Sequence, residues 1–399
     1  MGQQKQNQPK TRNPTDFQTQ EYVMRVFAFF LVFCVLGAPL RAATSFQPAL
    51  PGYSFSFPRD HGSHPPYSTE WWYYTGHLRS KSGREFGFQA TWFRTALAPS
   101  IKRQSKWATR DIYFAHFALT DSTGQKFLFT DKIGRGNLGL SGASVGTRAP
   151  RVHVGDWNLQ FGPNSGNTQT IRLSGTSDQS ATRGQHFGVR LAFRALKAPT
   201  IHGECGVSQK SSGVGRASHY YSFCRLDARG TVQLGEETFQ VTGQSWFDHE
   251  FGSAQLEHNQ TGWDWFSIQL NDGREMMLYH LRLRGSRVEP LSSGTLVERD
   301  GRTRHLKLFD FRLTPLEHST MESGARYPTS WKIEVPTLRL SLVATPALSD
   351  QELRPIRSGV ALSYWEGLIS LRGTAQGRPI SGRGYLEMTG YSKSFGGTF

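Results

Sequence analysis

The chain has 399 residues, of which 37% are hydrophobic, 13% aromatic and only 19% charged, with 42 glycines and a formal net charge of +15. Because disordered chains lack aromatic residues and long exposed helices carry more charge, this composition argues against both and favours a β-rich protein with many turns. The basic residues are scattered and no nucleic-acid-binding motif accompanies them, so we expect no nucleic-acid partner. Peripheral contact with an anionic membrane surface would suit the same charge.

The N-terminal segment has the pattern of a secretory leader. A polar, basic stretch is followed by the apolar run Val26–Leu36 and by small residues up to Ala42. Such a run is too short to span a bilayer comfortably and is typical of a signal peptide. We therefore predict a signal peptide over residues 1–42, cleaved near Ala42, and a secreted, periplasmic protein. A translation start at Met24 and an uncleaved N-terminal anchor are the alternatives.

After the leader, residues 43–66 predict an arm rich in proline and serine. From Tyr67 onward, short segments of alternating or aromatic residues are separated by glycine-containing turns, which predicts antiparallel strands. The Gly-rich residues 134–148 predict a long loop, and no segment predicts a helix of three or more turns. The clearest predicted strands are Phe86–Phe93, Asp111–Leu119, Gln125–Thr130 and Gly188–Phe193.

The chain contains two similar halves. The segments Trp71–Leu78 and Trp263–Leu270 each lead into a turn with the sequence Gly-Arg-Glu. Each half also has an Arg-Gly-Thr segment (229–231 and 372–374) that precedes a second pair of similar segments, Gly243–Asp248 and Gly382–Glu387. Chance similarity between hairpins is the alternative, but agreement at both ends indicates an internal duplication. We predict an all-β fold of two tandem lipocalin-like antiparallel β-barrels, over residues 67–253 and 254–399.

Two cysteines, Cys205 and Cys224, remain outside the predicted leader. In an oxidising compartment this pair predicts a disulfide that closes a loop or hairpin. Two buried free thiols are the alternative.

Three segments carry a resemblance to a known family, namely Tyr67–Leu78, Gly243–Gly252 and Gly262–Leu270. With their Glu-Trp-Trp-Tyr and Trp-x-Asp-x-Glu-x-Gly motifs they resemble the AttH-like family, whose relatives include the carotenoid 1,2-hydratases and many predicted secreted hydrolases. The resemblance implies a pair of lipocalin-like barrels. It also implies hydration of acyclic carotenoids, a hydro-lyase reaction, as the family's well-defined activity.

Hydration of an unactivated double bond needs a carboxylic acid that donates a proton and aromatic faces that stabilise the resulting cation, but no metal or organic cofactor. On a strand, Trp246, Asp248 and Glu250 share one face, so an acid lies beside an indole and a second carboxylate. Burial and the second charge would raise the pKa of one carboxyl. Asp248 and Glu250 are therefore candidate catalytic residues, with backbone capping or pairing to arginine as the structural alternative.

Asp264 is the other candidate acid. It shares a strand face with Phe266, while its neighbours Trp263 and Trp265 point to the opposite face. The resemblance to the hydratases implies an aspartate as the proton donor, but it does not choose between Asp248 and Asp264.

Further aromatic and polar residues on the predicted hairpins are candidates for ligand binding. Glu70 could instead form a buried salt bridge, and His280 could be a histidine of the core. His249 and Glu250 lack the second histidine of a zinc-protease motif, so we predict no metal site. The predicted ligand-binding residues are Trp246, Trp263, Trp265, Trp72, Tyr74, Glu70, His249, Tyr279 and His280.

Three functions stay open on the sequence. The first is binding of a lipophilic molecule, such as an isoprenoid or lipid, with cofactor-free hydration of a double bond. The second is a non-catalytic carrier for hydrophobic cargo. The third is a secreted hydrolase, for which the sequence offers no nucleophile motif in its required context, since Gly142–Gly146 matches G-x-S-x-G in a loop with no helix after it. The protonation state of the buried carboxyls would distinguish the first function from the second.

Overall fold

The computed structural model describes residues 1–2, 45–100, 105–163, 167–254, 256–357 and 363–396. The predicted signal peptide and its cleavage site lie outside these residues. Contacts divide the chain into two units, residues 1–43 and residues 44–399, and everything below concerns the second unit.

The described residues form an all-β protein. The helices among them are four 3-10 turns, η1 (Arg59–His61), η2 (Ser180–Thr182), η3 (Leu308–Asp310) and η4 (Pro336–Leu338). None of the helices in the described part of the chain is long and apolar enough to cross a membrane. The rest is strand and turn, as the aromatic and glycine-rich sequence predicts.

The first sheet holds thirteen strands in the order β4-β3-β2-β1-β13-β12-β9-β8-β7-β6-β5, with β10 and β11 paired to β12. Its strands are β1 (Thr69–Ser80), β2 (Glu85–Ala96), β3 (Asp111–Asp121), β4 (Lys126–Arg135), β5 (Ser141–Ala143), β6 (Arg151–Val154), β7 (Trp157–Phe161), β8 (Thr168–Thr176), β9 (His186–Ala195), β10 (Thr200–Ile201), β11 (Ser208–Gln209), β12 (Ala217–Leu234) and β13 (Glu237–Gly252). The four strands named from the sequence fall within β2, β3, β4 and β9 apart from one residue, Gln125, and the predicted loop 134–148 contains the end of β4 and the short β5.

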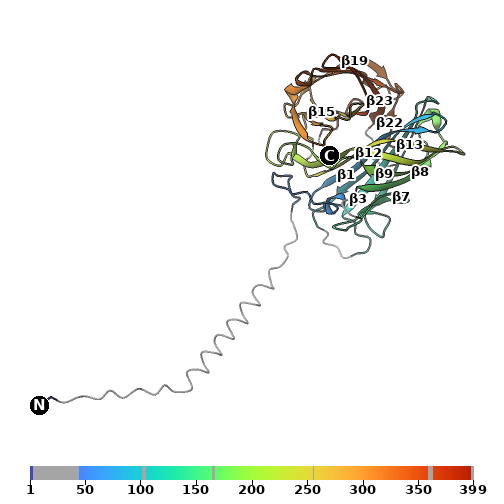
Figure 1. Cartoon of the computed structure of the whole chain (residues 1–399). Coiled ribbons are helices and arrows are strands. Elements are labelled where there is room, and N and C mark those ends of the chain that lie inside the picture. Colours follow the sequence, from blue (N-terminus) through green and yellow to red (C-terminus); the bar gives the residue numbers. More distant parts are fainter. Residues whose placement is uncertain (3–44, 101–104, 164–166, 255, 358–362, 397–399) are drawn as a thin grey trace. The chain divides into compact units, whose positions relative to one another are not determined.

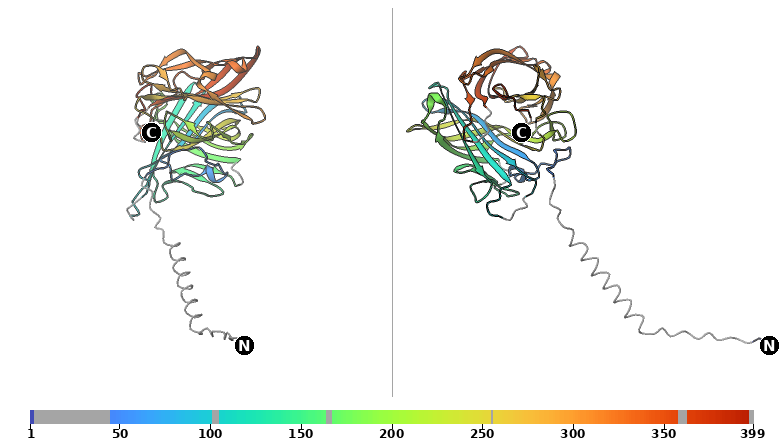
Figure 2. Two further views of the ribbon diagram at one scale, coloured as in Figure 1. Left: turned by 90° about the vertical axis from the view of Figure 1, so that its left-hand side faces the viewer. Right: turned by 180° about the vertical axis from the view of Figure 1, so that it is seen from behind.

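The second sheet holds eleven strands in the order β18-β17-β15-β14-β24-β23-β21-β20-β19, with β16 paired to β15 and β22 paired to β23. Its strands are β14 (Gln260–Leu270), β15 (Glu275–Leu283), β16 (Arg287–Val288), β17 (Ser293–Val297), β18 (Thr303–Lys307), β19 (Arg312–Thr320), β20 (Arg326–Val335), β21 (Leu340–Pro346), β22 (Glu352–Leu353), β23 (Tyr364–Ala375) and β24 (Arg378–Met388). The second sheet curls into a nearly closed barrel, whereas the first is a strongly bent half-barrel (Figures 1 and 2). The predicted fold class, all-β with two tandem lipocalin-like antiparallel β-barrels, is confirmed, the first of them being a half-barrel.

The two sheets repeat one pairing scheme. In each half the last strand pairs with the first, so β13 lies beside β1 and β24 lies beside β14. The register repeats as well, because Tyr73 lies opposite Asp248 in the first sheet and Trp265 lies opposite Glu387 in the second. These are equivalent positions of the two similar halves of the sequence, which supports the duplication.

Each sheet encloses its own core, and a third apolar cluster lies between the sheets. Trp72, Tyr74 and Phe247 belong to the core of the first sheet, and Phe266 belongs to that of the second. Strands β1, β2 and β12 pack against β24, β23, β14 and β15, and we call this face between the sheets the seam. The seam cluster consists of Tyr73, Tyr220, Cys224, Trp246, Trp265, Met277, Tyr279, Leu281, Val297, Leu368 and Tyr385.

The predicted disulfide is wrong, because both cysteines are free. Cys224 lies on β12 and is buried in the seam. Cys205 is exposed in the turn between β10 and β11, where it has a positive φ of 54°. The two side chains therefore belong to different environments, and the alternative of free thiols holds, with only Cys224 buried.

Candidate functional site

A cavity of about 150 Å³ lies in the seam, between the two sheets and outside both barrel cores. It lies where β1 begins and β13 ends, because Thr69 and Gly252 are among the residues that line it. The core that each sheet encloses is packed with side chains in the described residues. The aromatic rings that line the seam cavity are Trp71, Tyr73, Phe93, Phe114, Tyr220, Trp263, Trp265, Tyr279, Tyr364 and Phe395.

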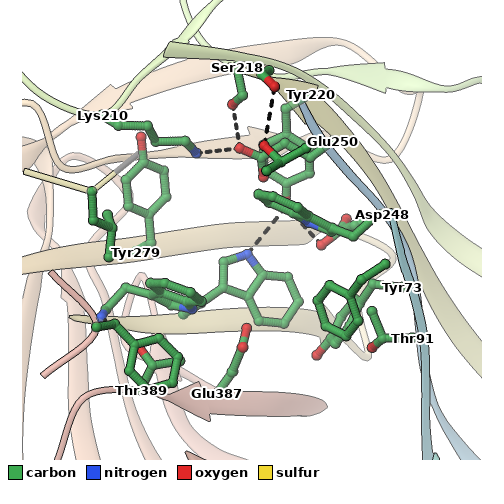
Figure 3. Close-up of a pocket in the computed structure, with 18 of the residues that line it drawn as sticks. Tyr73, Thr91, Lys210, Ser218, Tyr220, Asp248, Glu250, Tyr279, Glu387 and Thr389 are labelled. Carbon is green, nitrogen blue, oxygen red and sulfur yellow. Dashed lines mark hydrogen bonds and ion pairs between the residues drawn. The ribbon is translucent and has the colours of Figure 1, made fainter. Parts of the chain in front are cut away.

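The alternation along β13 brings two predicted acids to this cavity. Asp248 and Glu250 both line it. His249, which lies between them, and Phe247, which precedes Asp248, point into the core of the first sheet. This is the arrangement that a period of two predicts. Figure 3 shows Asp248 and Glu250 on one side of the cavity and Glu387, from the second sheet, on the other.

Asp248 is buried and accepts three hydrogen bonds. Tyr220 Oη donates to Oδ2 at 2.8 Å, and Trp246 Nε1 and the Ser222 hydroxyl both donate to Oδ1, the former at 2.6 Å. Burial raises the pKa of Asp248 to about 7, although these hydrogen bonds act in the opposite direction. The carboxyl can thus gain or lose a proton near neutral pH. Trp246 supports Asp248 from beside the cavity, and the Trp265 indole donates a hydrogen bond to Tyr220 Oη at 3.2 Å.

Glu250 is held in an ion pair. Lys210 Nζ lies 2.7 Å from Glu250 Oε1, and the Ser218 hydroxyl donates to the same oxygen. Burial alone would lower the pKa of Lys210, but the charge and hydrogen bond of Glu250, together with the charges of Tyr279 and Asp248, outweigh burial and raise that pKa. The structural alternative for Glu250 was pairing with an arginine. The residue is paired with a cation as that alternative requires, but the cation is Lys210.

Two further carboxyls line the cavity, Glu366 on β23 and Glu387 on β24, which lie opposite each other in the register. Neither oxygen of Glu366 accepts a hydrogen bond of ordinary length from the described residues, and the Tyr73 hydroxyl is the donor that acts on it. Burial, reinforced by the nearby charge of Glu387, raises the pKa of Glu366 well above its ordinary value, although Tyr73 acts in the opposite direction. Burial also raises the pKa of Glu387 to about 7, although a hydrogen bond from Trp263 lowers it in part.

The sequence offered a signal for only one of these carboxyls. Glu387 occupies the position in the second half that Asp248 occupies in the first, so the duplication alone points to it. Glu366 has no such signal, because its equivalent on β12 is Ser222, which lies opposite Asp248 as Glu366 lies opposite Glu387. Lys210 and Tyr220 were also missed, because they reach the site only through the packing of strands distant in sequence.

The arrangement suits acid chemistry on an apolar molecule. A carboxyl whose pKa lies well above its ordinary value can hold a proton and donate it, and two carboxyls with a pKa of about 7 can exchange one. The surrounding rings can stabilise a developing cation through their quadrupoles without capturing it.

The other predicted acid, Asp264, lies elsewhere. It does not line the cavity and is directed toward the interior of the second barrel, where Arg282 Nε lies 3.2 Å from Oδ2 and Tyr391 Oη donates to Oδ1 at 3.0 Å. Burial raises the pKa of Asp264, and the charge of Arg282 lowers it in part. The neighbours Trp263 and Trp265 point the other way and line the cavity, as the sequence predicts.

Four predicted ligand-binding residues, Glu70, Trp72, Tyr74 and His249, lie in the core of the first sheet and not at the cavity. Glu70 Oε2 accepts a hydrogen bond from Arg94 Nε at 2.9 Å, so its predicted alternative, a buried salt bridge, is confirmed. The imidazoles of His249 and His64 both contact Glu70 Oε1, at 2.9 and 2.6 Å. These two histidines and Glu70 are close enough together to hold a metal ion, but Arg94 and the imidazoles already occupy both carboxylate oxygens.

The last two predicted ligand-binding residues, Tyr279 and His280, point to opposite faces of β15. Tyr279 lines the cavity, and its ring centroid lies 5.0 Å from Lys210 Nζ. His280 points to the opposite face and stacks on Phe311 in the second barrel. Burial lowers the pKa of His280 to about 4, so it is a neutral histidine of the core, which was its predicted alternative.

Comparisons with known proteins give one matching family and several similar structures. The sequence model of the AttH-like family matches residues 48–391. An AttH structure from Nitrosomonas europaea has a TM-score of 0.75 and 31% sequence identity, and the match covers 87% of this chain and 100% of that one. Among curated proteins, none matches the sequence significantly.

Two more distant structures share the fold. Kievitone hydratase from Nectria haematococca has a TM-score of 0.62 at 13% identity, over 88% of this chain and 99% of that one. CghA with Sch210972 has a TM-score of 0.52 at 12% identity, over 89% and 97%. At this identity the two structures are evidence of a common fold alone.

Proposed function

This chain belongs to the AttH-like family, and we propose that it adds water to a carbon–carbon double bond of an apolar, isoprenoid-like molecule held in the seam cavity. The observation that carries the proposal is Glu366, a buried carboxyl that no cation neutralises in the described structure and whose pKa lies well above its ordinary value, although the Tyr73 hydroxyl lowers it in part. Burying such a carboxyl is unfavourable, so it is expected only where it has a chemical role. A protein that merely carries its ligand gains nothing from a protonated acid in a cavity of aromatic rings. From the leader sequence we further propose that the protein works in the periplasm.

In this proposal Glu366 donates its proton to one carbon of the double bond. The π electrons form the new C–H bond and leave a cation on the other carbon, which the rings of Trp265 and Tyr73 stabilise. A water molecule attacks the cation and gives its extra proton to Asp248 or Glu387, whichever is ionised. A proton passes back to Glu366 within the cluster, so the net change is the addition of one water.

The size of the cavity limits what part of a substrate it takes. Its volume of about 150 Å³ is that of an engineered cavity which accommodates benzene. Such a space accepts one branched isoprene unit and not a whole polyene. We therefore propose that the end of the substrate enters the seam while the remainder stays outside. Kievitone hydratase, which has this fold, shows in its name that the fold can support a hydration.

The test is incubation of the purified protein with acyclic and prenylated isoprenoids, followed by mass spectrometry for products heavier by one water. Three variants accompany it, namely Glu366→Gln, Asp248→Asn and Asp264→Asn. We expect product from the wild type and from Asp264→Asn, a loss of at least about a hundredfold in Glu366→Gln, which is the low end for a general acid, and a smaller loss in Asp248→Asn. Equal activity of Glu366→Gln and wild type would contradict the assignment, and a bound lipid without turnover would favour the carrier.

A further inference from the structure

Exposed apolar side chains gather on two loops of the first sheet. They lie on the β2–β3 connection and on the β4–β5 connection, and each is more than half exposed. We call these four residues the loop patch, and their exposed fractions are 61% for Leu97, 68% for Trp107, 53% for Leu138 and 56% for Leu140.

Hydrogen bonds between the loops keep the patch together. The side chains of Arg135 and Asn137 both donate to the Trp107 carbonyl oxygen, each at 3.1 Å. The backbone N–H of Gly136 donates to Asp111 O at 2.8 Å, and that of Leu97 donates to Arg110 O at 2.7 Å. The two loops therefore present their apolar side chains from adjoining segments and not from distant parts of the surface.

The loop patch is flanked by cations. Lys106 and Arg135 are exposed beside it, and Arg110 lies partly buried at its base. None of the three has an ion pair with a carboxylate in the described residues. Arg135 and Arg110 instead donate to backbone carbonyls, among them those of Trp107 and Pro65. Unpaired cations around exposed tryptophan and leucine side chains form the combination that binds anionic bilayer surfaces.

The patch lies at the same end of the sheet as the seam cavity. Phe93 on β2 and Phe114 on β3 line the cavity, and Leu97 lies four residues beyond Phe93, a separation of roughly 13 Å along an extended strand. The chain also enters the described fold at this end, because Gln47 accepts a hydrogen bond from Ser253 and pairs with Pro66.

From these observations we propose that the loop patch docks the protein on an anionic lipid bilayer, with the opening of the seam cavity directed toward the lipid. An apolar molecule dissolved in the bilayer could then reach the cavity without crossing water. The docking requires only the loops and their charges, so it stands or fails separately from the hydration reaction.

The experiment is co-sedimentation of the processed protein with vesicles of phosphatidylglycerol or of phosphatidylcholine. Measurement of the intact mass first shows that the leader is absent. We expect binding to the anionic vesicles, release at high salt, and weaker binding to the neutral ones. Trp107→Ser and Leu138→Ser should each reduce the partition coefficient at least about fivefold, because each removes a large apolar side chain from the interface. Phe309→Ser is the matched control, since Phe309 is an aromatic residue of η3, in the second half of the chain, that is 80% exposed.

Several results would overturn the docking surface. The first is that the wild type does not sediment with phosphatidylglycerol vesicles. The second is that Trp107→Ser binds as well as the wild type, and the third is that Phe309→Ser loses as much binding as Trp107→Ser. Circular dichroism of each variant shows that it is folded. The same assay on Glu366→Gln separates this proposal from the enzymatic one, because that variant should bind vesicles as the wild type does even though it should not turn over substrate.

Discussion

Charged side chains lie on both faces of the strands that carry the site. On β13, His249 points into the first core between Asp248 and Glu250, which point to the cavity. On β1, Glu70 points into that core beside Trp71, which lines the cavity. The ion cluster of Glu70 with its partners therefore joins β1 and β13 directly behind the acids. It explains why the motifs of the sequence place charged residues next to aromatic ones.

The first prediction concerns this cluster. Glu70→Gln leaves the buried Arg94 with Asp111 as its remaining carboxylate partner, at 3.0 Å. We expect the free energy of unfolding to fall by about 3 kcal/mol, because Arg94 loses its fully buried carboxylate partner and keeps only a partly exposed one, so its buried charge is less well compensated. Urea denaturation measures it. Glu85→Gln is the control, because its pair with Arg383 is exposed on both sides and should contribute less than about 1 kcal/mol. Equal losses in the two variants would show that the Glu70 cluster contributes no more to the free energy of unfolding than an exposed ion pair does.

The second prediction concerns pH. The pKa of Glu387 is raised from 4.5 to about 7 in the folded protein. The folded state then binds more protons than the unfolded state between these values, so this residue's contribution is full below pH 4.5 and is lost as the pH rises to about 7. We expect Glu387→Gln to become more stable relative to the wild type as pH increases over this interval. Thermal unfolding of both proteins across the interval measures the difference, and a constant difference would mean that the pKa of Glu387 is not raised.

At the scale of the strands, the duplication has left matched glycines where strands approach closely. A Cβ on Gly230 of β12 would lie 1.9 Å from Arg190 O, and a Cβ on Gly373 of β23 would lie 1.9 Å from Ser341 O. Both glycines come from the Arg-Gly-Thr segments that the sequence repeats. A side chain at either position would push the neighbouring strand away.

The third prediction follows from this geometry. Gly373→Ala should lower the free energy of unfolding by about 3 kcal/mol, because the backbone must shift to admit the methyl group. Gly142→Ala is the control, since its Cβ would meet only His153 at an ordinary 3.5 Å, and it should change stability by less than about 0.5 kcal/mol. Chemical denaturation of the two variants compares them. A tolerated alanine at Gly373 would mean that β21 and β23 are not packed so closely.

Strand alternation predicted which side chains share a face, but it could not predict what covers each face. The separation of Trp263 and Trp265 from Asp264 is as predicted, and so is that of Asp248 from His249. The choice of face was harder, because β1 and β13 are buried on both sides. Trp72 and Tyr74 were assigned to the ligand for this reason, since nothing local distinguishes a core from the seam.

At the scale of the whole molecule, the site exists only because two similar sheets pack face to face. Asp248 comes from the first sheet, and Glu366 and Glu387 come from the second, so neither half contains the cluster alone. The sequence predicts the two halves through their repeated segments, and the repeat makes Glu387 the counterpart of Asp248, although Glu387 was not among the predicted site residues. It could not predict Glu366, because the pairing of strands across the seam is set by tertiary packing and leaves no periodic signal.

The difference between the halves also bears on function. Two equivalent positions carry Ser222 in one half and Glu366 in the other, so the duplicated seam is asymmetric in its charge. Ser222 donates a hydrogen bond to Asp248, whereas Glu366 places a second acid beside Glu387. The seam thus has one acid that is well hydrogen-bonded and one that is not, which is the asymmetry that a proton donor and a proton acceptor need.

The central claim is that Glu366 carries a proton at neutral pH, and infrared difference spectroscopy tests it most directly. The spectrum of Glu366→Gln is subtracted from that of the wild type at about pH 7, the neutral point at which a carboxyl of ordinary pKa is ionised. We predict a carbonyl stretching band of a protonated carboxylic acid that is present in the wild type, absent in Glu366→Gln and unchanged in Glu250→Gln. A wild-type spectrum that instead gains only carboxylate bands over Glu366→Gln would show that Glu366 is ionised. That result would contradict the acid mechanism and leave the seam cavity as a binding site.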